Sequence, residues 1–240
     1  MPSADPGRSS PEEIELKLVV LDAAAIRTLI MDPAAVLPGV VPLGPARSVD
    51  ARDQYLDTAG RALGTAGLVA RIRTGDGGHR LTIKSLARRG VGAVHRRLEL
   101  EGDAARAEDA EEPEDGTGHV DTGEVGDPRG WPPSPARDRL LDAIGTDPLV
   151  TLATLRQRRL QRDVAVGASV VELSLDEVEV ARPGGRPERW VELECELRSG
   201  TEADLAALGV LLSRRPDLAP ATSSKLERAL IVASASFTER

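Results

Sequence analysis

The chain has 240 residues, of which 40% are hydrophobic and only 2% aromatic, with one cysteine and a net charge of -8. So few aromatic rings provide no platform for stacked bases, and we expect no nucleic-acid partner. One cysteine excludes an internal disulfide and suits a reducing cytoplasm. No stretch approaches the roughly 18 apolar residues of a membrane span, and residues 1–11 lack the apolar core of a signal peptide. We therefore expect a soluble cytoplasmic protein without a membrane partner.

The negative charge is concentrated in one segment. Residues 102–136 contain ten acidic and two basic residues and little apolar periodicity, which is typical of a disordered loop. The rest of the chain is balanced in charge. We predict a disordered N-terminus at 1–11 and a single domain over 12–240, with a disordered acidic insertion at about 102–136. A solubilising loop is favoured over a tail that competes for an internal cationic site.

Alternation of polar and apolar residues predicts eight β-strands, at 13–20, 49–57, 67–74, 80–85, 94–101, 150–159, 168–180 and 190–198. Helices are predicted at 22–31, at 135–144, and from the N-cap residue Thr201 to about 215. Eight antiparallel strands are enough to close a barrel. The expected fold class is α+β, an eight-stranded closed antiparallel β-barrel with helices packed outside.

Each predicted strand is polar or ionisable on one face only. Glu13, Glu15 and Lys17 share one face of the first strand, opposite the apolar Ile14 and Leu16. The later strands repeat the pattern with Arg71, Arg73, Lys84, Arg97, Glu99, Glu101, Arg156, Arg158, Glu172, Asp176, Glu192, Glu194 and Glu196. For any single strand, a solvated outer face of a sheet is the simpler interpretation.

Taken together, the polar faces favour a different arrangement. If apolar helices cover the outside of the closed sheet, then the polar faces point inward and form a charged tunnel. Cations about 7 Å apart would repel by roughly 2 kcal/mol per pair at an effective dielectric near 20. They therefore require a polyanion or interleaved carboxylates. A polyphosphate suits the basic rows, and a divalent ion such as Mg²⁺ would reconcile it with the carboxylates.

The ordered set of motifs resembles the CYTH superfamily, also called triphosphate tunnel metalloenzymes. Its N-terminal Glu-x-Glu-x-Lys signature is matched by Glu13, Glu15 and Lys17. Further similar segments, in the same order, are Gln54-Tyr55-Leu56-Asp57-Thr58, Leu68-Val69-Ala70-Arg71-Ile72-Arg73, Leu81-Thr82-Ile83-Lys84-Ser85, Arg97-Leu98-Glu99, Leu155-Arg156-Gln157-Arg158-Arg159, Val171-Glu172-Leu173-Ser174-Leu175-Asp176, Glu192-Leu193-Glu194-Cys195-Glu196 and Ser224-Lys225.

The resemblance implies a tunnel that binds a triphosphate together with Mg²⁺ or Mn²⁺ and usually hydrolyses it. By motif position, the phosphate-binding residues are expected to be Lys17, Arg71, Arg73, Lys84, Arg97, Arg156, Arg158 and Lys225. The metal ligands are expected among Glu13, Glu15, Asp176, Glu192, Glu194 and Glu196. Glu13, Glu15, Lys17 and Lys84 are the expected catalytic residues, with Glu13 or Glu15 orienting or deprotonating the attacking water.

Three functions remain open. The favoured one is a divalent-metal-dependent triphosphatase acting on inorganic triphosphate, because few aromatic residues argue against a nucleobase pocket. A class IV-type adenylyl cyclase or a thiamine triphosphatase is an alternative with the same fold. A noncatalytic polyphosphate-binding module is the other. The sequence leaves the oligomeric state unknown.

Some residues depart from the family pattern or lie outside the expected site. The acidic segment after Glu101 is unusually long, Ala229 stands where a glycine often follows the Ser-Lys element, and no histidine-rich CHAD domain is expected. The three histidines have no metal-ligand spacing. Cys195 faces the apolar side of its strand and is expected to be a small core residue.

Overall fold

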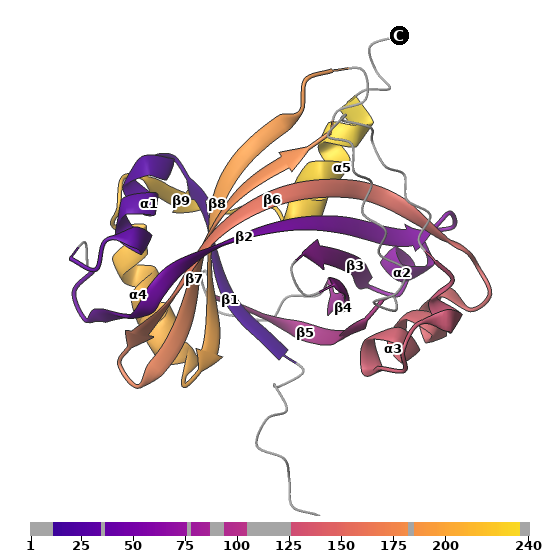
Figure 1. The fold of residues 1–240 in the computed structure, drawn as a ribbon, viewed down its shortest axis with the longest axis horizontal. Helices are drawn as coiled ribbons and strands as arrows, with labels where there is room; N and C mark the ends of the chain where they lie inside the picture. Colours follow the sequence, from indigo (N-terminus) through magenta and orange to yellow (C-terminus); the bar gives the residue numbers. More distant parts are fainter. Residues whose placement is uncertain are drawn as a thin grey trace, which may run out of the picture.

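In the computed structural model, residues 12–34, 37–75, 78–86, 94–104, 126–181 and 185–235 are described. Eight antiparallel strands form a closed barrel, and five α-helices of the described part lie outside it, which confirms the predicted fold class (Figure 1). The strands are β1 (Glu12–Val20), β2 (Val40–Thr58), β3 (Leu68–Gly75), β4 (Gly78–Ser85), β5 (Val94–Asp103), β6 (Leu149–Val166), β7 (Ser169–Val180) and β8 (Glu188–Ser199). A short strand, β9 (Leu218–Pro220), pairs with β1.

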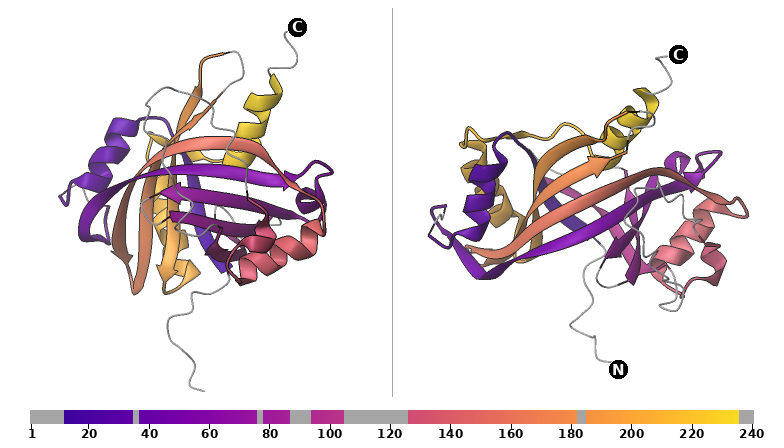
Figure 2. Two further views of the ribbon diagram at one scale, coloured as in Figure 1. Left: turned by 45° about the vertical axis from the view of Figure 1, so that its right-hand side comes forward. Right: turned by 45° about the horizontal axis from the view of Figure 1, so that its top comes forward.

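The strand order is β5-β4-β3-β2-β6-β7-β8-β1-β9, and the pairing of β5 with β1 closes the sheet. β1 is therefore hydrogen-bonded on both sides, with Glu13 opposite Arg97 of β5 and Lys17 opposite Glu194 of β8. β2 and β6 pair over most of their length and arch across the molecule (Figure 2). This closure brings the first and last barrel strands together, so that acidic residues from both ends of the sequence become neighbours.

Helices α1 (Ala23–Met31) and α4 (Glu202–Ser213) cover the barrel where β1, β6, β7 and β8 present their apolar faces. Asp22 caps α1 by accepting hydrogen bonds from the backbone N–H groups of Ala24 and Ala25. Thr201 caps α4 in the same way, because its side chain accepts a hydrogen bond from the backbone N–H of Asp204. The cluster they enclose contains Leu16, Ile26, Ile30, Leu173, Leu193, Cys195, Leu205 and Leu208. Burial of Cys195 in this cluster confirms its assignment to the core.

A second apolar cluster lies under α2 (Ala62–Thr65) and α3 (Pro135–Ile144), against β3 and β4. α3 begins at the residue predicted, because Ser134 caps it and Pro135 occupies the first helical position. Figure 1 shows α2 and α3 at the opposite side of the barrel from α1 and α4. Both sets of helices cover apolar outer faces, so the polar faces of the strands point into the barrel.

Helix α5 (Lys225–Ala235) packs against one end of the barrel. There Tyr55, Leu155, Trp190, Ala229 and Val232 form a third apolar cluster. The side chain of Ala229 is fully buried in it, so this departure from the expected glycine occupies a packing position. The sequence reasoning predicted neither α5 nor α2 nor β9.

The edges of the expected acidic insertion are ordered. Gly102 and Asp103 belong to β5, Ala104 is buried, and a 3-10 helix, η2 (Pro128–Gly130), precedes the buried Trp131. The expected boundaries at 102 and 136 are therefore too wide, because both ends pack on the barrel. Residues 105–125 of that prediction, and the predicted N-terminal segment 1–11, lie outside the described residues.

Within the described part of the chain, no helix is long and apolar enough to span a membrane.

Candidate functional site

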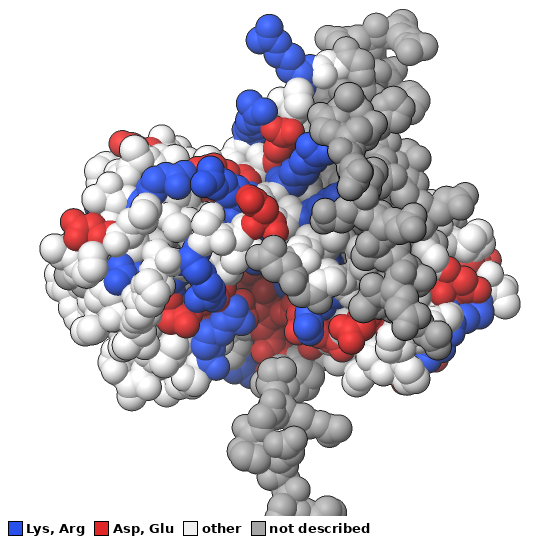
Figure 3. Space-filling view, in the orientation of Figure 1, with Lys and Arg blue, Asp and Glu red and all other residues white. Residues whose placement is uncertain are grey.

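The barrel encloses a cavity of about 1080 Å³. It is lined by side chains of strands β1 to β6 and β8 and by the residues at the start of α5. Figure 3 shows acidic side chains gathered at the centre of one face, with lysine and arginine side chains around them. The cations that line the cavity are Lys17, Arg71, Arg73, Lys84, Arg97, Arg159, Arg198 and Lys225.

Glu13 of β1 is held between two cations. Lys84 Nζ lies 2.8 Å from its Oε1, and Arg97 Nε donates to its Oε2 at 2.6 Å. Burial of Glu13 opposes its charged form, but Lys84 and Arg97 outweigh burial and hold the pKa of this carboxyl well below its usual range. Lys84 also contacts Glu99 at 3.1 Å. Glu13 is therefore an ionised carboxylate that orients two of the predicted phosphate-binding residues.

The next two inward residues of β1 are nearly inaccessible to solvent. Arg97 Nη2 lies 2.8 Å from Glu15 Oε1, and Lys17 Nζ lies 2.7 Å from Glu194 Oε1 and 3.6 Å from Glu15. Burial lowers the pKa of Lys17, but Glu15, Glu194 and Glu192 raise it above its ordinary value. The whole Glu-x-Glu-x-Lys signature thus lies inside the barrel, where its charges are paired across strands.

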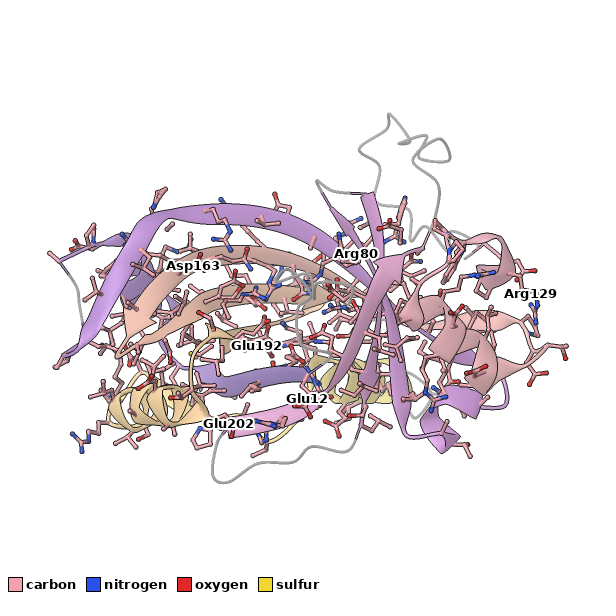
Figure 4. All side chains as sticks on the ribbon, turned by 90° about the horizontal axis from the view of Figure 1, so that it is seen from below. Glu12, Arg80, Arg129, Asp163, Glu192 and Glu202 are labelled. Carbon is pink, nitrogen blue, oxygen red and sulfur yellow. The ribbon has the colours of Figure 1, made fainter. Side chains whose placement is uncertain are left out.

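Asp176, Glu192 and Glu194 form a compact carboxylate group. One oxygen from each lies within 4.8 Å of the others, a spacing that could hold a metal ion. Figure 4 shows Glu192 inside the barrel, between the arched strands and β1, whereas Arg129 and Glu202 lie at the periphery. Two cations contact the group: Lys225 contacts all three carboxylates at 2.5 to 3.2 Å, and Arg159 contacts Asp176 at 2.8 Å and Glu194 at 3.0 Å.

Glu192 is the least compensated member of this carboxylate group. Its Oε1 is buried and makes no hydrogen bond within the described part of the chain, although Lys225 Nζ lies 3.2 Å away. Burial raises the pKa of Glu192, as do the neighbouring charges of Glu194 and Asp176, against the opposing effect of Lys225. Carboxylate oxygens are the ligands that Mg²⁺ prefers. The donor set and the orphaned oxygen both fit a further cation at this position.

Glu196 lies two residues after Glu194 on β8, on the same face of the strand, and also lines the cavity. Burial raises its pKa to about 7, helped by the negative charges of Glu13 and Glu99 and opposed by Arg198 and Lys84. Arg198 Nη1 lies 2.5 Å from Glu196 Oε1. Glu196 is therefore in the cavity as predicted, but outside the compact carboxylate group.

The β3 cations share one carboxylate that the sequence reasoning did not select. Asp53 of β2 has no exposed surface; it accepts hydrogen bonds from Arg73 Nε and Nη2, both at 2.7 Å, and its Oδ2 lies 3.5 Å from Arg71 Nη1. Burial raises the pKa of Asp53, but Arg71 and Arg73 outweigh burial and hold it well below its usual range. Asp53 lies directly before the Gln54-Tyr55 motif and shares the inward face of β2 with Tyr55. This place in the sequence was the signal that could have identified it.

Two predicted phosphate-binding residues are in the wrong place. Arg156 and Arg158 of β6 are exposed on the outside of the barrel, opposite Glu179 and Glu177 of β7. Arg159, which sequence reasoning missed, points inward with Gln157 and Gln161. The segment Arg156-Gln157-Arg158-Arg159 carries basic residues on both faces, so its alternation does not identify the inner one. Of the other predicted site residues, most line the cavity directly, whereas Glu15, Asp176 and Glu192 are buried and paired with cations that line it.

The chain is thus a closed antiparallel β-barrel protein whose interior carries ion-paired lysine, arginine and carboxylate side chains. The chain belongs to the CYTH family, because residues 12–230 match the CYTH domain model. No curated protein sequence matches the chain.

Two of the similar solved structures illustrate the shared fold. The first is a candidate adenylyl cyclase from Hippeastrum, which reveals a dominant triphosphatase activity. It has a TM-score of 0.59 and 22% identity, with 90% of this chain and 93% of that chain covered. The second is a candidate adenylate cyclase from Bacillus halodurans. It has a TM-score of 0.51 and 16% identity, with 91% of this chain and 98% of that chain covered. At these identities the likeness shows the fold alone.

Proposed function

We propose that this protein is a divalent-metal-dependent hydrolase of inorganic triphosphate, acting inside the barrel. The observation that carries the proposal is the cavity itself, in which the paired cations lie beside the carboxylate group Asp176, Glu192 and Glu194. CYTH family members are typically triphosphatases or cyclases, and the Hippeastrum relative is described by its triphosphatase activity. The single cysteine suits work in a reducing cytoplasm.

The cations would bind and orient the substrate. Lys17, Arg71, Lys84 and Arg97 come from four different strands, so together they would surround a chain of phosphates rather than one phosphate group. Guanidinium groups bind phosphate oxygens in pairs, and ammonium groups act as point charges. In phosphoryl transfer, positioning and charge neutralisation supply most of the catalysis. These residues would therefore contribute to both binding and rate.

Asp176, Glu192 and Glu194 would hold Mg²⁺ or Mn²⁺, and Glu13, Glu15 and Glu196 stay proposed as further ligands on the neighbouring strands β1 and β8. The ion supplies charge neutralisation at the phosphate oxygens and lowers the pKa of water. Glu15 is the residue we assign to orient the attacking water. Both oxygens of Glu13 accept hydrogen bonds from Lys84 and Arg97, whereas Oε1 of Glu15 makes no hydrogen bond within the described residues, although Arg97 Nη2 lies 2.8 Å away. Lys225 would move from the carboxylates to a phosphate when substrate binds.

Phosphate release from tripolyphosphate, thiamine triphosphate and ATP, measured in parallel with Mg²⁺ and with Mn²⁺, tests the proposal. We expect release from tripolyphosphate to be fastest and to stop when a chelator removes the metal. Faster phosphate release from thiamine triphosphate would identify that compound, rather than tripolyphosphate, as the substrate. Cyclic AMP formed from ATP would identify a cyclase. Tight binding of tripolyphosphate without release under all conditions would replace the hydrolase with a binding module.

A further inference from the structure

We infer that Asp53 is a positioning residue for the triphosphate site: it fixes Arg73 and Arg71 on the β3 wall so that they present a preformed anion-binding surface. The inference rests on the proposed function insofar as a polyphosphate occupies the cavity. It adds a residue to the site that itself carries the wrong charge for touching a phosphate.

The contacts of Asp53 explain how it acts. Arg73 uses both Nε and Nη2 on the two oxygens of Asp53, a bidentate arrangement that fixes the plane of the guanidinium group. Arg73 therefore turns only its remaining nitrogen, Nη1, away from Asp53. Gln157 Nε2 donates to Asp53 Oδ2 at 2.5 Å from the neighbouring strand β6. Three strands thus converge on one fully buried carboxylate, which prevents Arg73 from adopting other rotamers.

Arg71 is the cation that this arrangement leaves available. Its Nη1 lies 3.5 Å from Asp53, and its Nη2 donates to Thr82 Oγ1 at 3.2 Å. Its Nε is buried and makes no hydrogen bond within the described residues. A buried donor without an acceptor is costly. Since Arg71 lines the cavity, an anionic ligand oxygen is the acceptor that would satisfy it.

Because Asp53 is negatively charged, positioning and repulsion predict opposite changes in polyphosphate affinity when Asp53 is removed. A buried carboxylate near a polyanion repels it, so if Asp53 were only a neighbouring charge, its removal would tighten binding. If Asp53 positions the two arginines, its removal leaves them mobile and weakens binding instead. The direction of the change therefore separates positioning from simple repulsion.

The experiment measures the dissociation constant of tripolyphosphate by calorimetry, without divalent metal, for the wild-type protein and for Asp53→Asn. We expect about tenfold weaker binding in Asp53→Asn, the size of losing a charge-assisted contact. The matched control is Asp57→Asn. Asp57 is buried on the same strand, but it accepts from the backbone N–H of Leu63 and Gly64 at the start of α2. Its replacement should lower thermal stability and leave the dissociation constant unchanged.

A double-mutant cycle with Arg73→Gln shows whether Asp53 acts through Arg73. We expect Asp53→Asn and Arg73→Gln to be strongly non-additive, because either change breaks the same pair. Should Asp53→Asn fail to fold, Gln157→Ala provides the second variant. Gln157 supports Asp53 and is not among the cavity-lining residues, so weaker tripolyphosphate binding in this variant would support transmission through Asp53.

The possible outcomes distinguish the two proposals. Unchanged or tighter binding in Asp53→Asn, or in Gln157→Ala where that variant is used, overturns the positioning role while leaving the hydrolase intact. Wild-type protein that binds tripolyphosphate tightly but never releases phosphate overturns the hydrolase, and the positioning role is still judged by the binding constants. Wild-type protein that does not bind tripolyphosphate overturns both.

Discussion

Lys225 Nζ lies 2.5 Å from Oδ2 of Asp176, and the same ammonium group contacts Glu194 and Glu192 at 3.1 and 3.2 Å. The side chain of Lys225 is buried, and these carboxylates raise its pKa above the ordinary value although burial lowers it. The first residue of α5 thus supplies positive charge to the carboxylate group that fits a divalent ion. The ammonium group and a metal ion are therefore competitors.

Replacing Lys225 with methionine should strengthen binding of Mn²⁺ in the absence of any phosphate compound. The carboxylates then lose their internal cation but keep their positions, so the metal has less to displace. The measurement is the rise in melting temperature on adding Mn²⁺ alone, compared with wild type. The double variant Lys225→Met with Glu192→Gln is the control and should lose most of the gain. A rise no larger than that of wild type would contradict the assignment of Asp176, Glu192 and Glu194 to the metal.

Lys84→Ala should raise the KM for tripolyphosphate by about tenfold or more, the loss expected for a contact between charged groups. Lys84 lies in the cavity wall beside Glu13 and Glu99, so its removal also leaves these carboxylates less compensated. The matched controls are Arg156→Ala and Arg158→Ala, which remove equal charge from the outside of the barrel. Their KM should equal that of wild type. A rise in the two outer variants would show that the net charge, rather than the cavity wall, controls binding.

Glu15→Gln should lower kcat by about 10² to 10⁴, the range expected when a group that acts on the water is lost. The side chain keeps its size, so circular dichroism should change little, whereas loss of the buried ion pair with Arg97 should lower the melting temperature. Initial rates of phosphate release give kcat. If this variant turns over at the wild-type rate, the water is oriented by another residue and Glu15 loses its assigned role.

Asp53 should make the folded protein sensitive to acid. Its pKa is held below the usual range in the folded state, so its contribution to stability is fully present above the unfolded pKa of about 3.9 and is lost as the pH falls below that value. Urea unfolding between about pH 5 and pH 2 measures the slope. Asp53→Asn, which cannot titrate, should show a shallower decline. Equal slopes would mean that Asp53 is not paired in the folded state.

Cys195 should be unreactive towards thiol reagents until the protein unfolds. It is fully buried, and burial raises the pKa of its thiol above the ordinary value, so the reactive thiolate is scarce. Because it is the only cysteine in the chain, the reaction with a chromogenic disulfide reports on this site alone. Labelling should follow the urea unfolding curve. Rapid labelling of the native protein would contradict its place under α4.

Alternation predicted the barrel because its strands are half-buried, but the signal fails at the start of β2. Residues 40–48 contain Pro42, Gly44 and Pro45 and were not predicted as a strand, yet they extend β2. They are tolerated because this part of β2 pairs only with β6, and a register shift between Leu43 and Arg47 accommodates the irregular residues.

The candidate site was predictable where a motif fixed the inward face, as in Glu13, Glu15 and Lys17. It was mispredicted at β6, where Arg158 and Arg159 are adjacent and only one of them can point inward. On the outer face of this part of β6, Arg156 and Arg158 are exposed to solvent, so no apolar residues distinguish the outer face from the inner one. Asp53 was missed for a different reason: a single acidic residue in a predicted strand does not indicate which residues of the neighbouring strand it contacts, here Arg71 and Arg73 of β3.

The position of β1 has a consequence for how the protein is made. β1 is the first strand of the barrel, and its partners are β5 and β8, the latter ending at Ser199, with β9 following at Leu218–Pro220. Contacts between such distant segments form slowly, because a long loop must close before they stabilise the chain. During synthesis, β5 (Val94–Asp103) can pair with one edge of β1 first, but the other edge stays unpaired until β8 (Glu188–Ser199) has been made. Until then this nascent strand keeps an exposed edge, which a chaperone would need to protect.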